Sequence, residues 1–133
     1  LINYRCGTGH SVSFVGNVHE GPHALNGRNT TLMRPGMIVT DEPGVYETDL
    51  VGIRIENELV CVHKADNQYG TFLGFEPIMF VPIATSPIVP GVLTKDELDW
   101  LNNYHRQVFE KLAPRLNDEE REWLAKKCAA IGC

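Results

Sequence analysis

The stretch from Pro77 to Leu93 constrains the fold most strongly, because it is the most apolar part of the chain and is also rich in proline. A proline inside a helix removes a backbone hydrogen bond and clashes with the preceding turn. This stretch carries prolines at Pro77, Pro82, Pro87 and Pro90. No membrane-spanning helix fits that density of helix breakers. We therefore expect an extended segment that winds across a hydrophobic core.

The sequence before this segment, through about Val81, is strand-like. Met37–Val39 is a short apolar run with a Pro-Gly pair on each side, which is typical of a buried strand. Gly52–Val62 predicts a longer strand. Residues alternate between the two faces of a strand, so Arg54 and Glu56 should share one face and two isoleucines the other.

The sequence after the proline-rich segment predicts two helices. Thr94 and Asn117 are each followed three residues later by a glutamate, which is the pattern of a capping box. Apolar residues then recur at helical spacing after both positions. We expect strands within about residues 11–81 and helices within about residues 94–131, and strands followed by helices indicate an α+β fold.

Length and composition restrict the possible functions. The 133 residues suit one domain or a piece of one, and the first residue, Leu1, is not methionine, so we expect a piece of a longer protein. The formal net charge of −5 argues against nucleic-acid binding, which needs a basic surface. The four cysteines form no CxxC pair, and the N-terminus does not resemble a signal peptide. We expect reduced thiols and a cytoplasmic protein.

One histidine and two glutamates stand in settings that suit a metal site. His10 follows a Gly-Thr-Gly triplet, Glu42 precedes a proline, and Glu56 alternates with Arg54. Imidazole and carboxylate are ligands that divalent transition metals share, and such a set can activate water. A carboxylate at the end of an apolar strand, as at Glu42, needs a partner or a metal to offset its lost hydration. His19 can position a substrate or move a proton.

Each of these residues also has an ordinary interpretation. His10 and His19 suit structural loop histidines, Glu42 a solvated turn residue, and Glu56 an ion pair with Arg54 on a solvent-facing strand. Three other histidines have no motif around them. We expect His23, within a turn-rich loop over 21–29, and His63 at the surface, and His105 in helix packing.

Taken together and in this order, the motifs resemble the C-terminal half of the catalytic domain of Xaa-Pro aminopeptidase (aminopeptidase P). This enzyme is a pita-bread metallopeptidase, like methionine aminopeptidase, prolidase and creatinase. The resemblance covers essentially the whole chain and implies an antiparallel curved sheet followed by C-terminal helices. The matching segments are Cys6–His10, Asn17–Pro22, Pro35–Gly44, Gly52–Asn57, Phe75–Pro77 and Leu98–Tyr104.

The resemblance also implies the site. Family members bind two divalent ions, most often Mn²⁺, with Zn²⁺ or Co²⁺ as alternatives, through two aspartates, one histidine and two glutamates. The histidine falls on His10 and the glutamates on Glu42 and Glu56, and the Glu42 equivalent also acts as general base. His19 matches a histidine that contacts the scissile peptide, and Arg54 matches an arginine that supports the ligands.

Two departures from the family pattern matter. The two aspartate ligands have no counterpart in these residues, so we expect the chain alone to bind metal weakly and to hydrolyse nothing. A further possibility is that the chain is only a folding unit, and its half-sheet would then expose an edge and an apolar face, which favours self-association. Cys6 stands where many relatives carry a histidine near the substrate pocket, and a small buried thiol is its simplest interpretation.

The implied activity belongs to the longer parent protein, a hydrolase that uses a metal-activated water to remove an N-terminal residue from peptides with proline second. Prolidase, which cleaves Xaa-Pro dipeptides, is the alternative enzyme, and a metal-free pita-bread binding module is the alternative of another class. The parent is expected to be a cytoplasmic homodimer with peptide substrates and with neither nucleic-acid nor membrane partners.

Overall fold

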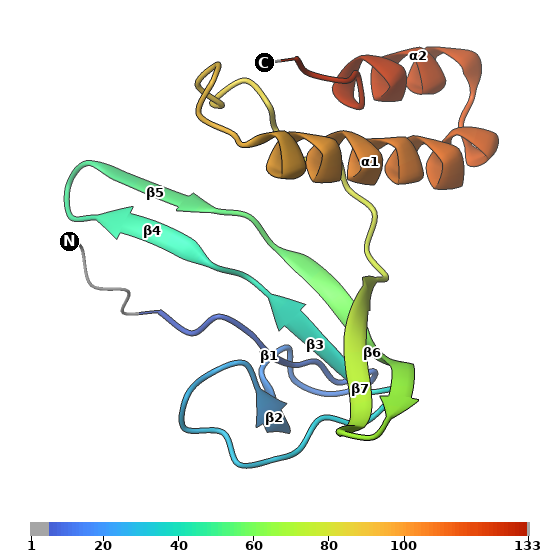
Figure 1. The fold of residues 1–133 in the computed structure, drawn as a ribbon. Helices are drawn as coiled ribbons and strands as arrows, with labels where there is room; N and C mark the ends of the chain where they lie inside the picture. The colour runs from blue at the N-terminus through green and yellow to red at the C-terminus, as the bar shows by residue number, and fades with distance from the viewer. Residues whose placement is uncertain (1–5, 133) are drawn as a thin grey trace. The chain divides into compact units, whose positions relative to one another are not determined.

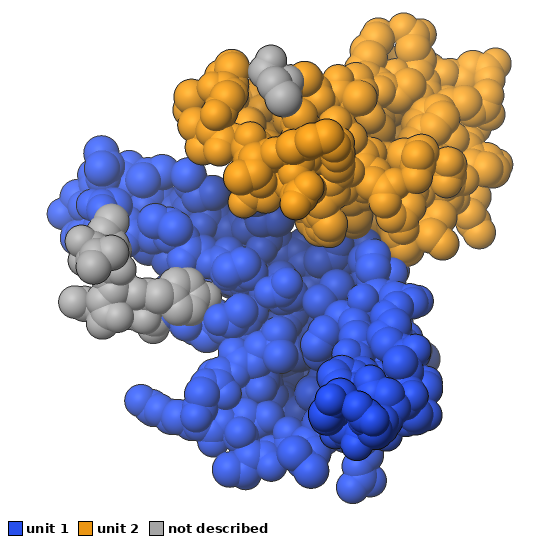
Figure 2. Space-filling view, viewed as in Figure 1, with its two compact units in different colours: residues 1–79 blue, residues 80–133 orange. Residues whose placement is uncertain are grey.

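The computed structural model describes residues 6–132, and the chain divides into two compact units, residues 1–79 and residues 80–133 (Figures 1 and 2). The described strands belong to the first unit and the helices to the second. This confirms the α+β fold expected from the order of strand and helix signals. Among the described residues, no helix has the length and apolarity that crossing a bilayer requires.

The strands of the first unit pair in antiparallel fashion throughout. β1 pairs with β2, β6 lies between β3 and β7, and β4 pairs with β5. The strands are β1 His10–Ser11, β2 Glu20–Ala24, β3 Ile38–Asp41, β4 Gly44–Glu47, β5 Val51–Arg54, β6 Asn57–Asn67 and β7 Gly70–Pro77.

Two of these pairings form one long ribbon with a gap in it. Asp41 of β3 pairs with Asn57 of β6, and Gly44 of β4 pairs with Arg54 of β5. Both pairings have the same register, so the second continues the first after two unpaired residues on each side. The prediction of one continuous strand over Gly52–Val62 is therefore wrong in one respect, because this segment is divided between β5 and β6.

Pro43 explains the gap. The N–H of Glu42 donates to the carbonyl of Thr8 at 2.6 Å, away from β6. Successive N–H groups in an antiparallel ladder point to opposite sides, so the next residue would donate across the ribbon towards Ile55. That residue is Pro43, which has no N–H. The ladder loses this bond, and the chain is free of regular pairing beside Glu42.

β2 occupies part of the segment for which a loop was expected. Its residue Ala24 pairs with His10, and the N–H of Leu25 donates to the carbonyl of Gly9 at 2.8 Å. His23 of this strand is only 8% exposed, and its Nε2 lies 2.6 Å from the carbonyl oxygen of Ile38. The expectation of a surface position for His23 was wrong, because the strand turns its side chain inwards.

The helical unit begins as its capping signals predict. α1 spans Lys95–Leu112, a 3-10 turn covers Ala113–Arg115, and α2 spans Asp118–Lys127. The side chains of Thr94 and Asn117 each accept a hydrogen bond from the backbone three residues on, and both reciprocal capping boxes are present. Both predicted caps are confirmed.

The core of the helical unit is built on Tyr104, Val108 and Leu124. Val108 and Leu124 are apolar residues of α1 and α2, and both are almost fully buried. The hydroxyl of Tyr104 donates to the carbonyl of Val81 at 3.0 Å, so the extended segment before the helices is tied to α1 by a polar bond as well as by packing.

His105 is a fully buried histidine of α1, as expected for a helix-packing residue. The N–H of Ile83 donates to its Nε2 at 3.1 Å, which requires the ring proton on Nδ1. Nδ1 is buried without a hydrogen-bond partner. Burial lowers the pKa of His105 below its ordinary value, because the charged ring would lose hydration.

The buried His105 should make the protein less stable in acid. A lowered folded-state pKa means that the unfolded chain binds the proton more readily, so this stability is present above the ordinary value of about 6.5 and is lost as the pH falls through the folded value. Replacing His105 with Gln should flatten the loss by at most about 1.4 kcal/mol per pH unit. Denaturant unfolding between pH 7 and pH 4 measures this.

The matched control is His63→Gln, since His63 is exposed and the chemical change is the same. Parallel stability-against-pH curves for native protein and His105→Gln would contradict the assignment.

Candidate metal centre

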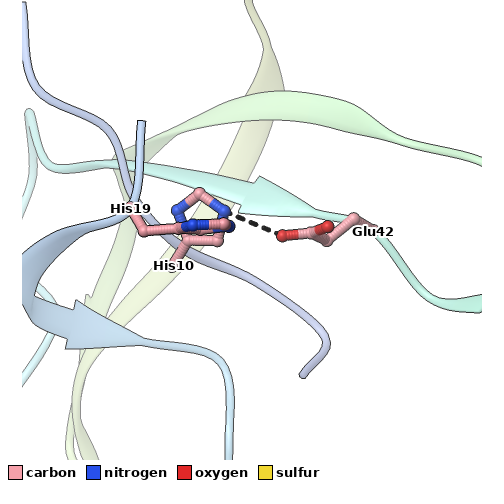
Figure 3. A group of neighbouring side chains, drawn as sticks. All are labelled: His10, His19 and Glu42. Atoms are coloured by element: carbon pink, nitrogen blue, oxygen red, sulfur yellow. Dashed lines mark ion pairs between the residues drawn. The ribbon is translucent and has the colours of Figure 1, made fainter. Parts of the chain in front are cut away.

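Glu42, in the gap of the ribbon, is the centre of a buried polar cluster. It is 7% exposed, and its Oε1 lies 2.9 Å from Nε2 of His10 (Figure 3). The hydroxyl of Thr40 donates to the same oxygen at 3.0 Å. Arg54 donates from a terminal guanidinium nitrogen to the other oxygen at 2.5 Å. The need for a partner, inferred from the position of Glu42 after an apolar strand, is met by Thr40 and Arg54.

His10 presents the nitrogen that a metal would bind. Its Nδ1 lies 2.9 Å from the backbone carbonyl of Ser11. A carbonyl only accepts hydrogen bonds, so the neutral ring carries its proton on Nδ1 and turns the lone pair of Nε2 towards Glu42. A lone pair and a carboxylate oxygen repel one another at this distance. A proton or a metal ion is required between His10 and Glu42.

The donor set fits a divalent metal. His10, His19 and Glu42 each offer one ligand atom, and these atoms lie within 4.8 Å of one another. Metal–ligand bonds of about 2.1 Å place two neighbouring ligand atoms of one ion about 3 Å apart, close to the His10–Glu42 separation. His19 is exposed, and its ring meets the His10 ring edge-on with centroids 4.2 Å apart (Figure 3).

Gly9 lets the segment that carries His10 approach Glu42. A Cβ atom at Gly9 would lie 1.8 Å from the backbone oxygen of Thr40, so no other residue fits without moving the backbone. The same close approach allows the bond from the Glu42 N–H to the carbonyl of Thr8. Gly9, the second glycine of the Gly-Thr-Gly triplet, is therefore needed for close backbone packing beside the site and not for an unusual backbone angle.

Glu56 lies outside the cluster of candidate ligand atoms that the described residues form. It is exposed and stands between β5 and β6. Extending the register of either neighbouring pairing places it directly opposite Glu42. Because Glu42 directs its N–H away from the ribbon, this is a non-hydrogen-bonded position, where opposite side chains share a face and lie closest.

Arg54 belongs to the same face and joins the site to Tyr46, which sequence reasoning missed. Its Nε donates to the Tyr46 hydroxyl at 2.8 Å. That hydrogen bond, with the charges of Glu42 and Glu56, raises the pKa of Arg54 above its ordinary value. The sequence feature that could have indicated Tyr46 is the pair of glycines Gly44 and Gly52. Cβ atoms at these two positions would lie 2.7 and 3.0 Å from atoms of the Tyr46 ring.

The cysteines that the structure describes take no part in the cluster of ligand atoms. Cys6, Cys61 and Cys128 are free thiols, and Cys133 lies outside the described residues. Cys6, the residue that departs from the family pattern, is half-buried. Burial raises the pKa of Cys128, which keeps that thiol protonated.

Comparison with known proteins identifies the class of protein that carries this site. A sequence model of metallopeptidase family M24 matches residues 2–63, and one of the C-terminal region of peptidase M24 matches residues 71–131. The chain belongs to metallopeptidase family M24.

Within that family the chain is similar to aminopeptidase P, which confirms the resemblance. Aminopeptidase P2 of Arabidopsis thaliana is 46% identical over 92% of this chain and 18% of the relative. A probable Xaa-Pro aminopeptidase P of Coprinopsis cinerea is 41% identical over 98% of this chain and 22% of the relative. The chain thus spans about a fifth of the length of the curated relatives it matches.

A solved structure supports the fold. The X-prolyl aminopeptidase of Caenorhabditis elegans, described as a cytosolic enzyme with a di-nuclear active site, matches with a TM-score of 0.80 and 39% identity. The match covers 94% of this chain and 21% of that one. The expected part of a pita-bread fold is confirmed.

The close approach at Gly9 can be tested by Gly9→Ala. The added methyl should push β1 away from Thr40 and cost about 1–3 kcal/mol or more, as overpacking does. It should also weaken binding of a divalent metal, because His10 moves with β1. Denaturant unfolding and calorimetric Mn²⁺ titration of the full-length protein measure both effects.

Gly7→Ala is the matched control, since a Cβ atom at Gly7 meets nothing within 4 Å. Equal effects of the two substitutions would show that the contact at Gly9 does not hold the site together.

Proposed function

We propose that this chain is the C-terminal portion of the catalytic domain of an Xaa-Pro aminopeptidase. The parent enzyme would remove the N-terminal residue from peptides with proline second. The observation that carries the proposal is the buried contact of 2.9 Å between His10 and Glu42, two metal-ligand types brought together from distant parts of the sequence. Membership of a metallopeptidase family and the aminopeptidase P relatives support it.

In this proposal His10, Glu42 and Glu56 hold the metals, and two further carboxylates come from parts of the protein outside this chain. The di-nuclear site of the C. elegans enzyme supports a pair of ions here. Imidazole and carboxylates suit Mn²⁺, and also Zn²⁺ or Co²⁺. The proposed position of Glu56 rests on the register that sets it opposite Glu42.

Bound metal ions would supply an activated water as the nucleophile. Glu42 would take up the proton that the nucleophile loses. Arg54 donates to Oε2 of Glu42, whereas Oε1 faces His10. The exposed ring of His19 beside it can donate a hydrogen bond to a substrate carbonyl.

The proposal includes a cytoplasmic location, supported by the C. elegans enzyme, which is described as cytosolic. The homodimeric parent stays a prediction.

The proposed role of Glu42 predicts that Glu42→Gln abolishes peptide cleavage. The amide keeps the shape of the side chain but cannot take up a proton, so kcat should fall roughly 10²–10⁴-fold. The assay uses the full-length protein with Mn²⁺ on Xaa-Pro-Xaa tripeptides and Xaa-Pro dipeptides. Preference for dipeptides would indicate a prolidase instead.

Glu76→Gln is the matched control, because Glu76 is an exposed partner of Lys64 on β7. Retained cleavage by Glu42→Gln, or equal losses in both variants, would refute the general-base role.

The missing carboxylates predict that the 133-residue chain alone binds Mn²⁺ weakly and cleaves no Xaa-Pro peptide. Three ligands leave much of the coordination sphere of two ions to water, so affinity should be far below that of the full-length protein. Calorimetric titration of both proteins measures the difference. Tight binding of two ions by the short chain would contradict the assigned ligand set.

A further inference from the structure

We propose that Thr40 is a positioning residue of the metal centre, whose hydroxyl fixes the backbone of His10 and the carboxylate of Glu42 relative to each other. The inference rests on the proposed function, since it takes both residues as ligands. Thr40 lies in β3, two residues before Glu42, and is 2% exposed.

The hydroxyl of Thr40 has its hydrogen bonds fixed in direction. The backbone N–H of His10 donates to Oγ1 at 3.0 Å. Oγ1 in turn donates to Oε1 of Glu42 at 3.0 Å. A backbone amide can only donate and an ionised carboxylate can only accept, so the single hydroxyl proton must point at Glu42.

This hydroxyl joins two segments that are far apart in the sequence. β1 is only two residues long, and His10 is 30 residues from Thr40 in the sequence. The bond from the Glu42 N–H to Thr8 fixes the backbones to each other but leaves the carboxylate free to turn. The Thr40 bond acts on the carboxylate itself and selects which oxygen faces His10.

Arg54 donates to the other carboxylate oxygen. Its side chain is 39% exposed, so water competes with Glu42 for the guanidinium group. Of the two side chains that donate to the Glu42 carboxylate, Thr40 and Arg54, Thr40 is the buried one. Its hydrogen bond should therefore be the more persistent of the two, because no water replaces it when the side chain fluctuates.

The test compares Thr40→Val with Thr40→Ser in the full-length protein. Valine keeps the branched shape and removes the hydroxyl, whereas serine keeps the hydroxyl. Mn²⁺ affinity, measured by calorimetry, should fall about 10–100-fold in Thr40→Val, the usual effect of losing a group that orients a ligand. Thr40→Ser should bind within about threefold of the native protein, since the orienting hydroxyl is retained.

Thr71→Val is the matched control. The hydroxyl of Thr71 also donates to a carboxylate, that of Asp66, at 2.8 Å, but it lies on β7 and outside the candidate ligand cluster. Thr71→Val should leave Mn²⁺ affinity unchanged. Native-like affinity in Thr40→Val, or an equal loss in Thr71→Val, overturns the proposal.

Denaturant unfolding of the metal-free proteins separates positioning from folding. If Thr40→Val does not fold, Thr40→Ala against Thr40→Ser decides the question with the same expected difference in affinity. Native-like Mn²⁺ affinity in Thr40→Ala would then overturn the proposal. Because the readout is metal affinity, it is independent of peptide cleavage. A native protein that binds Mn²⁺ but cleaves no Xaa-Pro peptide would refute the proposed function and leave the role of Thr40 standing.

Discussion

The close approach of the segment before β1 to the end of β3 is the contact on which the site depends. Gly9 lies so near the Thr40 carbonyl that a side chain is excluded, and the N–H of Glu42 reaches the carbonyl of Thr8. Only then do His10 and Glu42 meet. The site is thus fixed by backbone packing first, and the side-chain hydrogen bonds refine a geometry that the backbone has already set.

Pro43 links this packing to the chemistry. By withholding one N–H it ends regular pairing where Glu42 and Glu56 stand opposite each other. Two like charges in that position destabilise a ladder unless a cation offsets them. Arg54 supplies part of that positive charge through its contact with Glu42. A metal ion at this break in the sheet would therefore be favourable, because it would relieve the repulsion that the register creates.

Local signals predicted much of the fold. The caps at Thr94 and Asn117 involve groups three residues apart, so their hydrogen bonds could be inferred from the sequence alone. The division of the strand over Gly52–Val62 could not, because its cause, Pro43, lies on the partner strand. His23 was misplaced for a related reason: its strand, β2, pairs with β1, which has only two residues and is too short to carry a periodic pattern.

The candidate site also has a part that local sequence predicts and a part that depends on tertiary contacts. The need of Glu42 for a partner followed from its place after an apolar strand, since burial of a carboxylate has a cost wherever it occurs. Which groups meet that need depends on register and on the approach of distant backbone. Thr40 therefore carried no signal that separates it from an ordinary strand residue, and Tyr46 carried only the two glycines that lie against its ring. Tyr46 lies over two glycines and accepts a hydrogen bond from Arg54, while the hydroxyl of Thr40 bonds to the backbone of His10 and to the carboxylate of Glu42. Both act through residues that the sequence did identify. Supporting residues of this kind are defined by tertiary contacts. A sequence motif therefore identifies the residues that are supported, but not the residues that support them.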